Sequence, residues 1–106
     1  MVKIIDGDTL DALVDLGFEV QIRRRIRLKG INAPESRTKD LAEKKLGLAA
    51  KRRLEELLGP SEGVFVLISH GLGKYGRCLG EIFLEDSEES INQQLINEGH
   101  AREYKV

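Results

Sequence analysis

The sequence of 106 residues lacks tryptophan and has only one cysteine, Cys78. A single cysteine cannot form a disulfide within the chain, which excludes the disulfide-dependent class of small secreted scaffolds. Aromatic residues make up only 5% of the chain, so leucine, isoleucine and valine must build the core. No segment approaches the roughly 20 apolar residues of a membrane-spanning helix, and we expect no membrane partner. A secretory signal pattern is also missing, which fits an intracellular protein or a trimmed mature form of a secreted one.

The sequence has almost no net charge. Its formal charge of −1 means that attraction to a polyanion must come from local patches. Basic residues gather at 23–29 and acidic residues at 81–89, so the two ends of the molecule can orient a polyanion. The 41% apolar and 33% charged residues are typical of a folded chain. We expect one domain, residues 1–106, and no pattern indicates an obligate protein partner.

Alternating apolar and polar residues predict the strands. The longest alternation, at 18–29, predicts a strand with one buried face. Arg24 interrupts that face, which predicts a bulge or a bend there. A continuous apolar run at 64–68 predicts a buried strand, and shorter strands are expected at 10–16 and 78–84.

Two segments have the three- and four-residue spacing of helices. The first covers residues 40–58 and ends at Gly59-Pro60. The second covers residues 91–98, with Ser90 as its expected N-cap. With a short first strand before Asp6, the order of three strands, a helix, two strands and a helix fits a small closed Greek-key barrel of the OB type. We therefore expect a mainly β, α+β fold: a five-stranded OB-fold barrel with a helix between strands 3 and 4 and a C-terminal helix.

Three short segments carry the residues of a possible site: Asp6 to Thr9, Arg27 to Glu35, and Lys74 to Arg77. Asp6-Gly7-Asp8-Thr9 places two carboxylates on a turn, and carboxylate oxygens are the ligands that Ca²⁺ or Mg²⁺ prefers. An ordinary Asp-Gly turn explains the same residues. The second segment, Arg27 to Glu35, gathers an always-charged guanidinium, a neutral oxygen ligand and a carboxylate at a strand end. Taken singly, each is equally explained as a solvated surface residue.

A glycine-rich segment matches the spacing of a dinucleotide-binding loop. That fingerprint needs a helix to begin at the loop, whereas the residues after Gly71 to Gly76 are typical of a strand. We therefore interpret the glycines as a hairpin connection. Asn92, on the last predicted helix, is expected to make buried hydrogen bonds rather than take part in catalysis.

Taken together, the segments resemble the staphylococcal nuclease (thermonuclease) family. The matching residues are Asp6-Gly7-Asp8-Thr9 after Ile5, Arg27 with Pro34-Glu35, and Lys74-Tyr75-Gly76-Arg77. They occur in the family's order and at matching separations over nearly the whole chain. The resemblance implies an OB-fold nuclease that hydrolyses DNA and RNA with Ca²⁺, without sequence specificity, and leaves a 3′-phosphate and a 5′-hydroxyl.

The resemblance also implies roles for individual residues. Asp8 would be a direct metal ligand with Asp6 nearby, and Asn32 and the backbone carbonyl of Ala33 would occupy the other ligand positions. Glu35 would hold or activate the attacking water.

The same resemblance implies how the phosphates would be bound. Arg27 and Arg77 would hold the scissile phosphate, while Lys74 and Tyr75 would contact a neighbouring terminal phosphate. Two guanidinium groups can meet a phosphate bidentately without losing their charge, which fits these roles.

Position 32 departs from the family pattern, because it holds asparagine where the family has aspartate. The amide keeps an oxygen ligand but removes a negative charge, so Ca²⁺ affinity should fall or another divalent ion should be preferred. The alternative interpretation is a catalytically weak or inactive module that binds nucleic acid. Arg27, Glu35 and Arg77 argue for the nuclease, because binding alone needs no glutamate beside a phosphate.

Overall fold

The main sheet of the computed structural model contains five strands in the order β1-β2-β3-β6-β5. The structure describes residues 2–72, 78–85 and 87–104. Neighbouring strands are antiparallel, except that β3 and β6 are parallel. The strands are β1 Lys3–Asp6, β2 Thr9–Asp15, β3 Gln21–Leu28, β5 Val66–Leu72 and β6 Cys78–Phe83.

Two α-helices cover the sheet, and both predictions are confirmed. The longer helix, α1 (Leu41–Leu58), begins at Asp40, whose carboxylate accepts hydrogen bonds from two backbone N–H groups of the first turn. The 3₁₀ turn η1 (Gly59–Ser61) follows it. The second helix, α2 (Ile91–Asn97), begins at Ser90 as predicted. Within the described part of the chain, no helix is long and apolar enough to cross a membrane.

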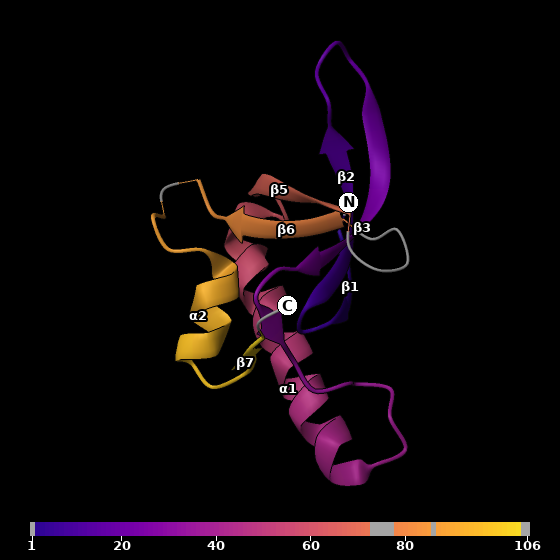
Figure 1. Ribbon diagram of the computed structural model, residues 1–106, viewed down its shortest axis with the longest axis vertical. Helices are drawn as coiled ribbons and strands as arrows, with labels where there is room; N and C mark the ends of the chain where they lie inside the picture. The colour runs from indigo at the N-terminus through magenta and orange to yellow at the C-terminus, as the bar shows by residue number, and fades with distance from the viewer. Residues whose placement is uncertain (1, 73–77, 86, 105–106) are drawn as a thin grey trace.

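The strand order and the place of α1 between β3 and β5 confirm the OB-type fold, but the sheet is not closed. β1 and β5 stand at opposite ends of the strand order, and no described residues pair them. A second sheet, absent from the sequence prediction, joins β4 (Ile31–Asn32) to β7 (Arg102–Glu103). Figure 1 shows this small sheet beneath the main one, near the chain's C-terminal end.

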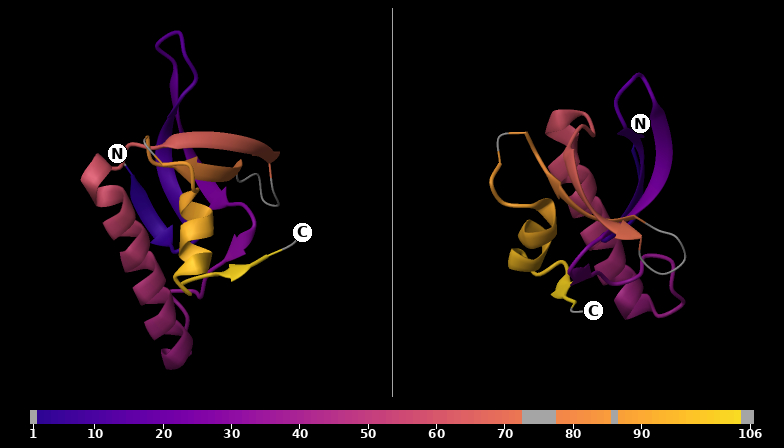
Figure 2. Two further views of the ribbon diagram at one scale, coloured as in Figure 1. Left: turned by 90° about the vertical axis from the view of Figure 1, so that its left-hand side faces the viewer. Right: turned by 45° about the horizontal axis from the view of Figure 1, so that its top comes forward.

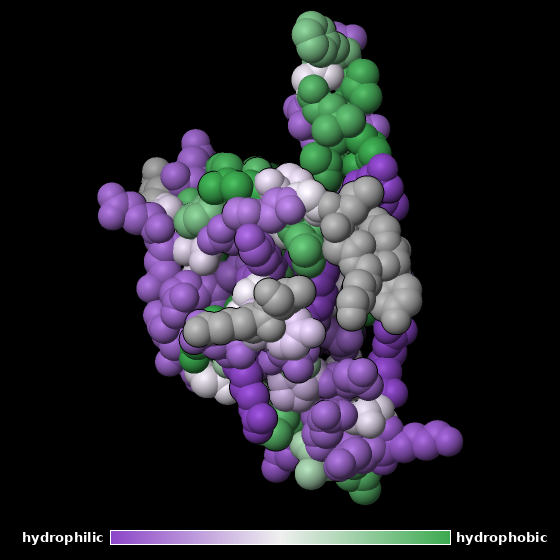
Figure 3. Space-filling model, viewed as in Figure 1, coloured by the Kyte–Doolittle hydropathy of each residue, from purple (hydrophilic) through white to green (hydrophobic). Residues whose placement is uncertain are grey.

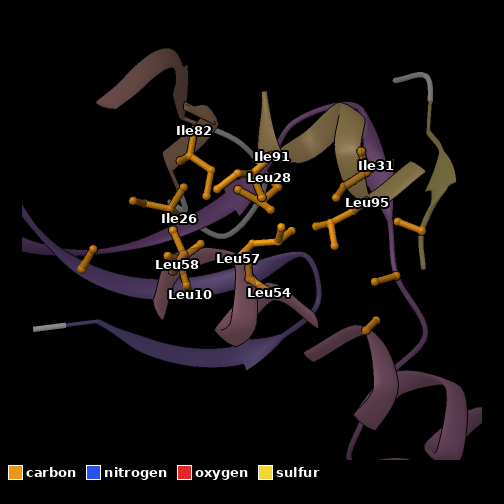
Figure 4. Close-up of a cluster of buried hydrophobic side chains, with 14 residues drawn as sticks. Leu10, Ile26, Leu28, Ile31, Leu54, Leu57, Leu58, Ile82, Ile91 and Leu95 are labelled. Atoms are coloured by element: carbon orange, nitrogen blue, oxygen red, sulfur yellow. The ribbon is translucent and has the colours of Figure 1, made fainter. Parts of the chain in front are cut away.

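One cluster of apolar side chains forms the core between the sheet, α1 and α2 (Figure 4). α1 lies alongside β1 and closes one side of this cluster (Figure 2). Burying a leucine or isoleucine side chain contributes about 1.5–3 kcal/mol, so the cluster is the main favourable term in folding. Its most deeply buried members are Leu10, Ile26, Leu28, Ile31, Leu54, Ile82, Ile91 and Leu95.

Asn92 bridges this core to the sheet and confirms its predicted structural role. Its side chain is 4% exposed. The amide nitrogen donates to the carbonyls of Lys29 and Gly80 at 2.9 and 3.0 Å. The amide oxygen accepts from the N–H of Ile82 at 3.1 Å. One side chain therefore bonds three backbone groups, of which the Gly80 carbonyl also accepts from the Lys29 N–H at 2.8 Å.

The hairpin of β2 and β3 corrects the prediction for residues 18–29. β3 begins only at Gln21, and Phe18 lies fully exposed in the turn instead of on a buried face. Pairing continues without interruption through Arg24, opposite Ala12, so the predicted bulge is absent. The irregularity occurs instead between Ile4 and Asp6 of β1.

The apolar run at 64–68 is also less buried than predicted. Val64, Val66 and Ile68 are 71%, 53% and 47% exposed. These residues belong to or precede β5, which is an edge strand of the sheet. A run of apolar residues cannot by itself distinguish a central strand from an edge strand, which is why the sequence misled here.

Candidate active site

Asp8 is fixed between the turn after β1 and the segment after β4. Its carboxylate is 6% exposed. One oxygen accepts a hydrogen bond from the N–H of Ala33 at 2.7 Å, and the other accepts from the hydroxyl of Thr9 at 2.8 Å. These bonds join two segments 25 residues apart in the chain. Asp8 is therefore a positioned acceptor rather than a residue of a free surface turn.

The guanidinium group of Arg27 contacts both Asp8 and Asn32. Its Nη1 donates to the carbonyls of Leu28 and Ile31 at 2.9 and 2.8 Å. Its Nη2 donates to Oδ1 of Asn32 at 3.2 Å and lies 3.5 Å from Oδ2 of Asp8. The side chain is 14% exposed, so its charge is held mostly inside the protein. Two of the predicted site residues, Asp8 and Asn32, thus converge on the guanidinium group of a third, Arg27.

Asp6 holds the backbone next to Glu35. The N–H and hydroxyl groups of Ser36 both donate to Oδ1 of Asp6, at 3.0 and 2.5 Å. Ser36 is 3% exposed, whereas Glu35 is exposed. Sequence reasoning singled out Asp6 and Glu35 but missed Ser36, although it follows Glu35 directly. The pair of bonds fixes where the Glu35 side chain leaves the backbone.

Two small residues on α1 let these segments lie directly against the helix. A Cβ atom at Gly47 would overlap the carbonyl group of Glu35 and lie 2.7 Å from the nitrogen of Ser36. Three residues further along α1, and on the same face, Ala50 packs against Gly7. A Cβ atom at Gly7 would lie 2.7 Å from the Cβ of Ala50. The sequence offered no clear signal for this role of Gly47.

A cavity of about 680 Å³ opens beside the site. Asn32, Ala33 and Glu35 line it on one side, and the start of α1 lines another. Arg102 of β7 lies directly opposite Asn32 in the small sheet and also lines the cavity. The cavity therefore connects Glu35 with Asn32, the one member of the Asp8–Arg27–Asn32 group that lines it. Sequence reasoning missed Arg102, because the pairing of β4 with β7 had no recognisable pattern.

The oxygen atoms of Asp8, Asn32 and Ala33 are of the kind that a hard divalent cation prefers as ligands. Asp8 and Asn32 offer oxygen atoms that both lie within 3.5 Å of the same Arg27 nitrogen, and Ala33 offers a backbone carbonyl next to Asn32. No group of three His, Cys, Asp or Glu side chains that could hold a metal occurs among the described residues. Asp8 supplies the one carboxylate among these three oxygen donors, and Arg27 places a positive charge beside it.

The remaining predicted residues, Lys74, Tyr75 and Arg77, lie outside the described residues. The strand that follows them is described, since β6 begins at Cys78. Cys78 pairs with Ile26 and Leu79 pairs with Arg27, in the parallel pairing of β6 with β3. The antiparallel pairing of β5 and β6 agrees with the predicted hairpin connection.

Comparisons with known proteins identify relatives for this fold and arrangement. Residues 25–106 match the model of the family described as staphylococcal nuclease homologue. The chain is 30% identical to a protein named micrococcal nuclease from Shigella flexneri, an alignment that covers 99% of this chain and 57% of that protein. It is 29% identical to Protein ParB from Escherichia coli, over 99% of this chain and 56% of that protein. The chain spans a little over half the length of these relatives.

Proposed function

Because this chain belongs to the family of staphylococcal nuclease homologues, we propose that it hydrolyses phosphodiester bonds in DNA and RNA with a divalent cation, Ca²⁺ in the first instance. The observation that carries the proposal is the convergence of Asp8 and Asn32 on Arg27, beside a cavity that Glu35 lines. The nuclease name of the Shigella flexneri relative supports the same reaction class. Cleavage is proposed to be independent of sequence and to leave a 3′-phosphate.

Arg27 has donors left for a phosphate. A guanidinium group carries five N–H donors. The two hydrogens of Nη1 meet two backbone carbonyls, and one hydrogen of Nη2 meets Asn32. No acceptor for the N–H of Nε occurs among the described residues, and Nη2 lies 3.5 Å from Oδ2 of Asp8. The edge formed by Nε and Nη2 matches the two oxygens of a phosphate. The internal bonds orient Arg27, and that edge binds the substrate.

The cation would be held by Asp8, Asn32 and the carbonyl of Ala33. When bound, it would act as a Lewis acid that draws negative charge from the phosphate oxygens. The Ala33 N–H bond to Asp8 orients the carboxylate, and Asp6 fixes the adjoining backbone through Ser36. The chain's own contribution is to hold these oxygens in place before substrate arrives.

Glu35 supplies the acceptor for a proton of the attacking water. Its carboxylate is exposed beside the cavity, so a water molecule can reach it. Whether it takes the proton or only orients the water depends on its basicity in the substrate complex. We propose Arg77 as the second phosphate ligand, with Lys74 and Tyr75 on a neighbouring terminal phosphate. The pairing of Leu79 with Arg27 supports this, because it brings β6 next to Arg27 within two residues of Arg77.

A metal series tests the proposal. Wild-type protein is incubated with single-stranded DNA and with RNA in Ca²⁺, Mg²⁺, Mn²⁺ or chelator, and fragments are separated by gel electrophoresis. Cleavage in at least one metal and none in chelator is expected. Folded protein that cleaves neither substrate under any metal would reject the nuclease.

The competing function is a module that binds nucleic acid without cutting it. Asn32 favours it, because the amide provides no charge for the cation and already accepts a bond from Arg27. Under this alternative, oligonucleotide binding has a normal salt dependence but the strand stays intact. Asn32→Asp then separates the two, since an added carboxylate should raise cleavage in Ca²⁺ only if position 32 is a ligand.

A further inference from the structure

The β2–β3 hairpin extends well beyond the body of the sheet. We call residues 11–25 the arm. β1 pairs with β2 only as far as Asp11, and β3 pairs with β6 only from Ile26 to Leu28, so beyond Asp11 and Arg25 the arm is a two-stranded ribbon without a further neighbour among the described strands. Figure 1 shows it projecting from the top of the molecule, and Figure 3 shows apolar side chains on its surface. The roles proposed for the site residues do not account for this extended hairpin.

Three arginines form a row that leads from the site into the arm. Arg23, Arg25 and Arg27 occupy alternate positions of β3, so their side chains leave the same face of the strand. Arg24 leaves the opposite face. Successive members of the row lie about 7 Å apart, because a strand rises about 3.3 Å per residue. The last member, Arg27, is the candidate phosphate ligand.

The face that carries this row has a positive balance. Asp11 lies across from Arg25 in β2 and accepts two hydrogen bonds from it, at 2.8 and 3.2 Å. Lys3 of β1 pairs with Asp11 on its other side. The hydrogen bond from Arg25 lowers the pKa of Asp11, and the charges of Arg23 and Lys3 lower it further. Asp11 is thus one carboxylate among three cations.

The tip of the arm holds an aromatic side chain outward. Phe18 is fully exposed, and Leu16 and Val20 beside it are 58% and 51% exposed. The N–H of Val20 donates to the carbonyl of Gly17 at 2.9 Å and closes a tight turn. Phe18 and Glu19 occupy its centre with φ of 54° and 64°, a left-handed conformation that asparagine and glycine ordinarily fill. The chain accepts backbone strain to place a phenylalanine in solvent.

We infer that the arm binds the nucleic acid beyond the scissile phosphate: Arg23 and Arg25 contact successive phosphates, and Phe18 stacks on a base. The inference rests on the proposed function, because it takes the substrate of that site as its ligand. Guanidinium groups at regular spacing fit a chain of phosphates, and an exposed aromatic ring fits an unpaired base of any sequence. The row and the site share one strand and one face, so a single polynucleotide can contact both.

The reach of the arm sets the length of strand required. Arg23 lies about 13 Å from Arg27 along β3, and Gln21, where β3 begins, about 20 Å, at about 3.3 Å per residue; the turn with Phe18 lies beyond Gln21. A stacked strand rises about 3.4 Å per nucleotide, so about four nucleotides reach Arg23 and more than about six are needed to reach the turn. Binding should therefore tighten as the oligonucleotide is lengthened from about four nucleotides to beyond about six.

A lipid membrane is a less favourable ligand for the arm than a polynucleotide. Glu19 and Asp15 put carboxylates beside the apolar tip, which anionic headgroups repel, while the arginines lie behind the tip toward the site. For a polynucleotide the same order is favourable, because the tip meets a base and the arginines meet phosphates. Vesicle binding is nevertheless an outcome that the experiment must measure.

Fluorescence anisotropy in chelator tests the arginine row without cleavage. Labelled single-stranded DNA of 4 and 15 nucleotides is titrated over a salt series with wild type, Arg23→Ala and the matched control Arg24→Ala. The two variants lose the same charge at adjacent positions on opposite faces. Arg23→Ala should reduce the slope of log K against log salt by about 0.7 on the 15-mer, and Arg24→Ala should not. Asp11→Asn should tighten binding, because it releases Arg25.

The same titration tests the tip. Phe18→Ser should weaken binding of the 15-mer by about 5- to 100-fold and leave binding of the 4-mer at its wild-type value, since stacking on one base is worth that much. Leu16→Ser is the control at the same tip. Equal effects of Arg23→Ala and Arg24→Ala, or an unchanged Phe18→Ser, would overturn the inference. So would wild-type DNA binding by Phe18→Ser with loss of binding to phosphatidylserine vesicles.

Failure of the inference about the arm and failure of the proposed nuclease function give different results. A wild type that binds by this pattern but never cuts would support the arm and reject the nuclease. Cleavage by the wild type, together with arm variants that bind both oligonucleotides as the wild type does, would support the nuclease and reject the inference about the arm.

Discussion

Gly47→Ala should damage the site through the backbone that carries Glu35. The new Cβ would overlap the Glu35 carbonyl and lie 2.7 Å from the Ser36 nitrogen, whereas ordinary contacts of a Cβ atom begin at 3.4 Å. The Glu35–Ser36 backbone must therefore retreat by about 1 Å. A misplacement of that size at a reacting centre lowers turnover by about 10²-fold. The bond from Ser36 to Asp6 would be stretched by the same movement.

The free energy of unfolding should fall as well. Overpacking of a tight contact costs about 1–3 kcal/mol, and the better helix propensity of alanine returns about 1 kcal/mol, so the net loss is about 0–2 kcal/mol. Urea denaturation followed by circular dichroism measures the stability, and cleavage of single-stranded DNA in Ca²⁺ measures the turnover. Lys45→Ala is the control, because Lys45 is exposed on the same helix and its replacement by alanine adds no new contact. Full activity of Gly47→Ala would refute the placement of Glu35 at the reacting centre.

Three further predictions concern the buried Asn92 side chain, the ion pair between Arg53 of α1 and Glu98 after α2, and the proposed metal ligand Asn32. Asn92→Ala should lower the free energy of unfolding by about 2 kcal/mol, because it removes the side-chain partner of the Ile82 N–H and of the Lys29 carbonyl. Urea titration beside the exposed control Asn97→Ala decides whether the loss is specific. The hydrogen bond from Arg53 lowers the pKa of Glu98, so this pair stabilises the fold above the ordinary value of 4.5, and the stabilisation is lost as the pH falls through the lowered pKa. Glu98→Gln should then flatten the decline of Tm between about pH 5 and pH 3. The same decline in the variant as in the wild type would show that the Arg53–Glu98 pair does not contribute to stability. Asn32→Asp should tighten Ca²⁺ binding in calorimetry, and equal affinity would mean that position 32 is not a ligand.

The sequence predicted the elements whose signals are local. The N-cap at Ser90 and the helical spacing over 40–58 follow from short-range chemistry, and the structure confirms both. The strand order was accessible because three strands, a helix and two strands with bends have few solutions as a small sheet. The convergence of Asp8 with Asn32 rests on long-range pairing, and only the ordered resemblance to a family indicated it.

What the sequence could not predict depends on partners distant in the chain. Val64 and Phe18 are apolar, and periodicity alone placed both in strands, yet one precedes an edge strand and the other occupies a turn. The pairing of β4 with β7 involves two residues from each strand, too short for any pattern. Gly47 looks like a weak point of a helix until the backbone of Glu35 is found against it.

Cleavage of a 5′-labelled single-stranded oligonucleotide in Ca²⁺, with analysis of the product ends, tests the central claim most directly. The wild type should yield fragments that end in a 3′-phosphate. Glu35→Gln and Arg77→Ala should each lower the rate by orders of magnitude while thermal unfolding stays at its wild-type midpoint. An intact oligonucleotide after incubation with folded wild type, or cleavage by Glu35→Gln at the wild-type rate, would contradict the account.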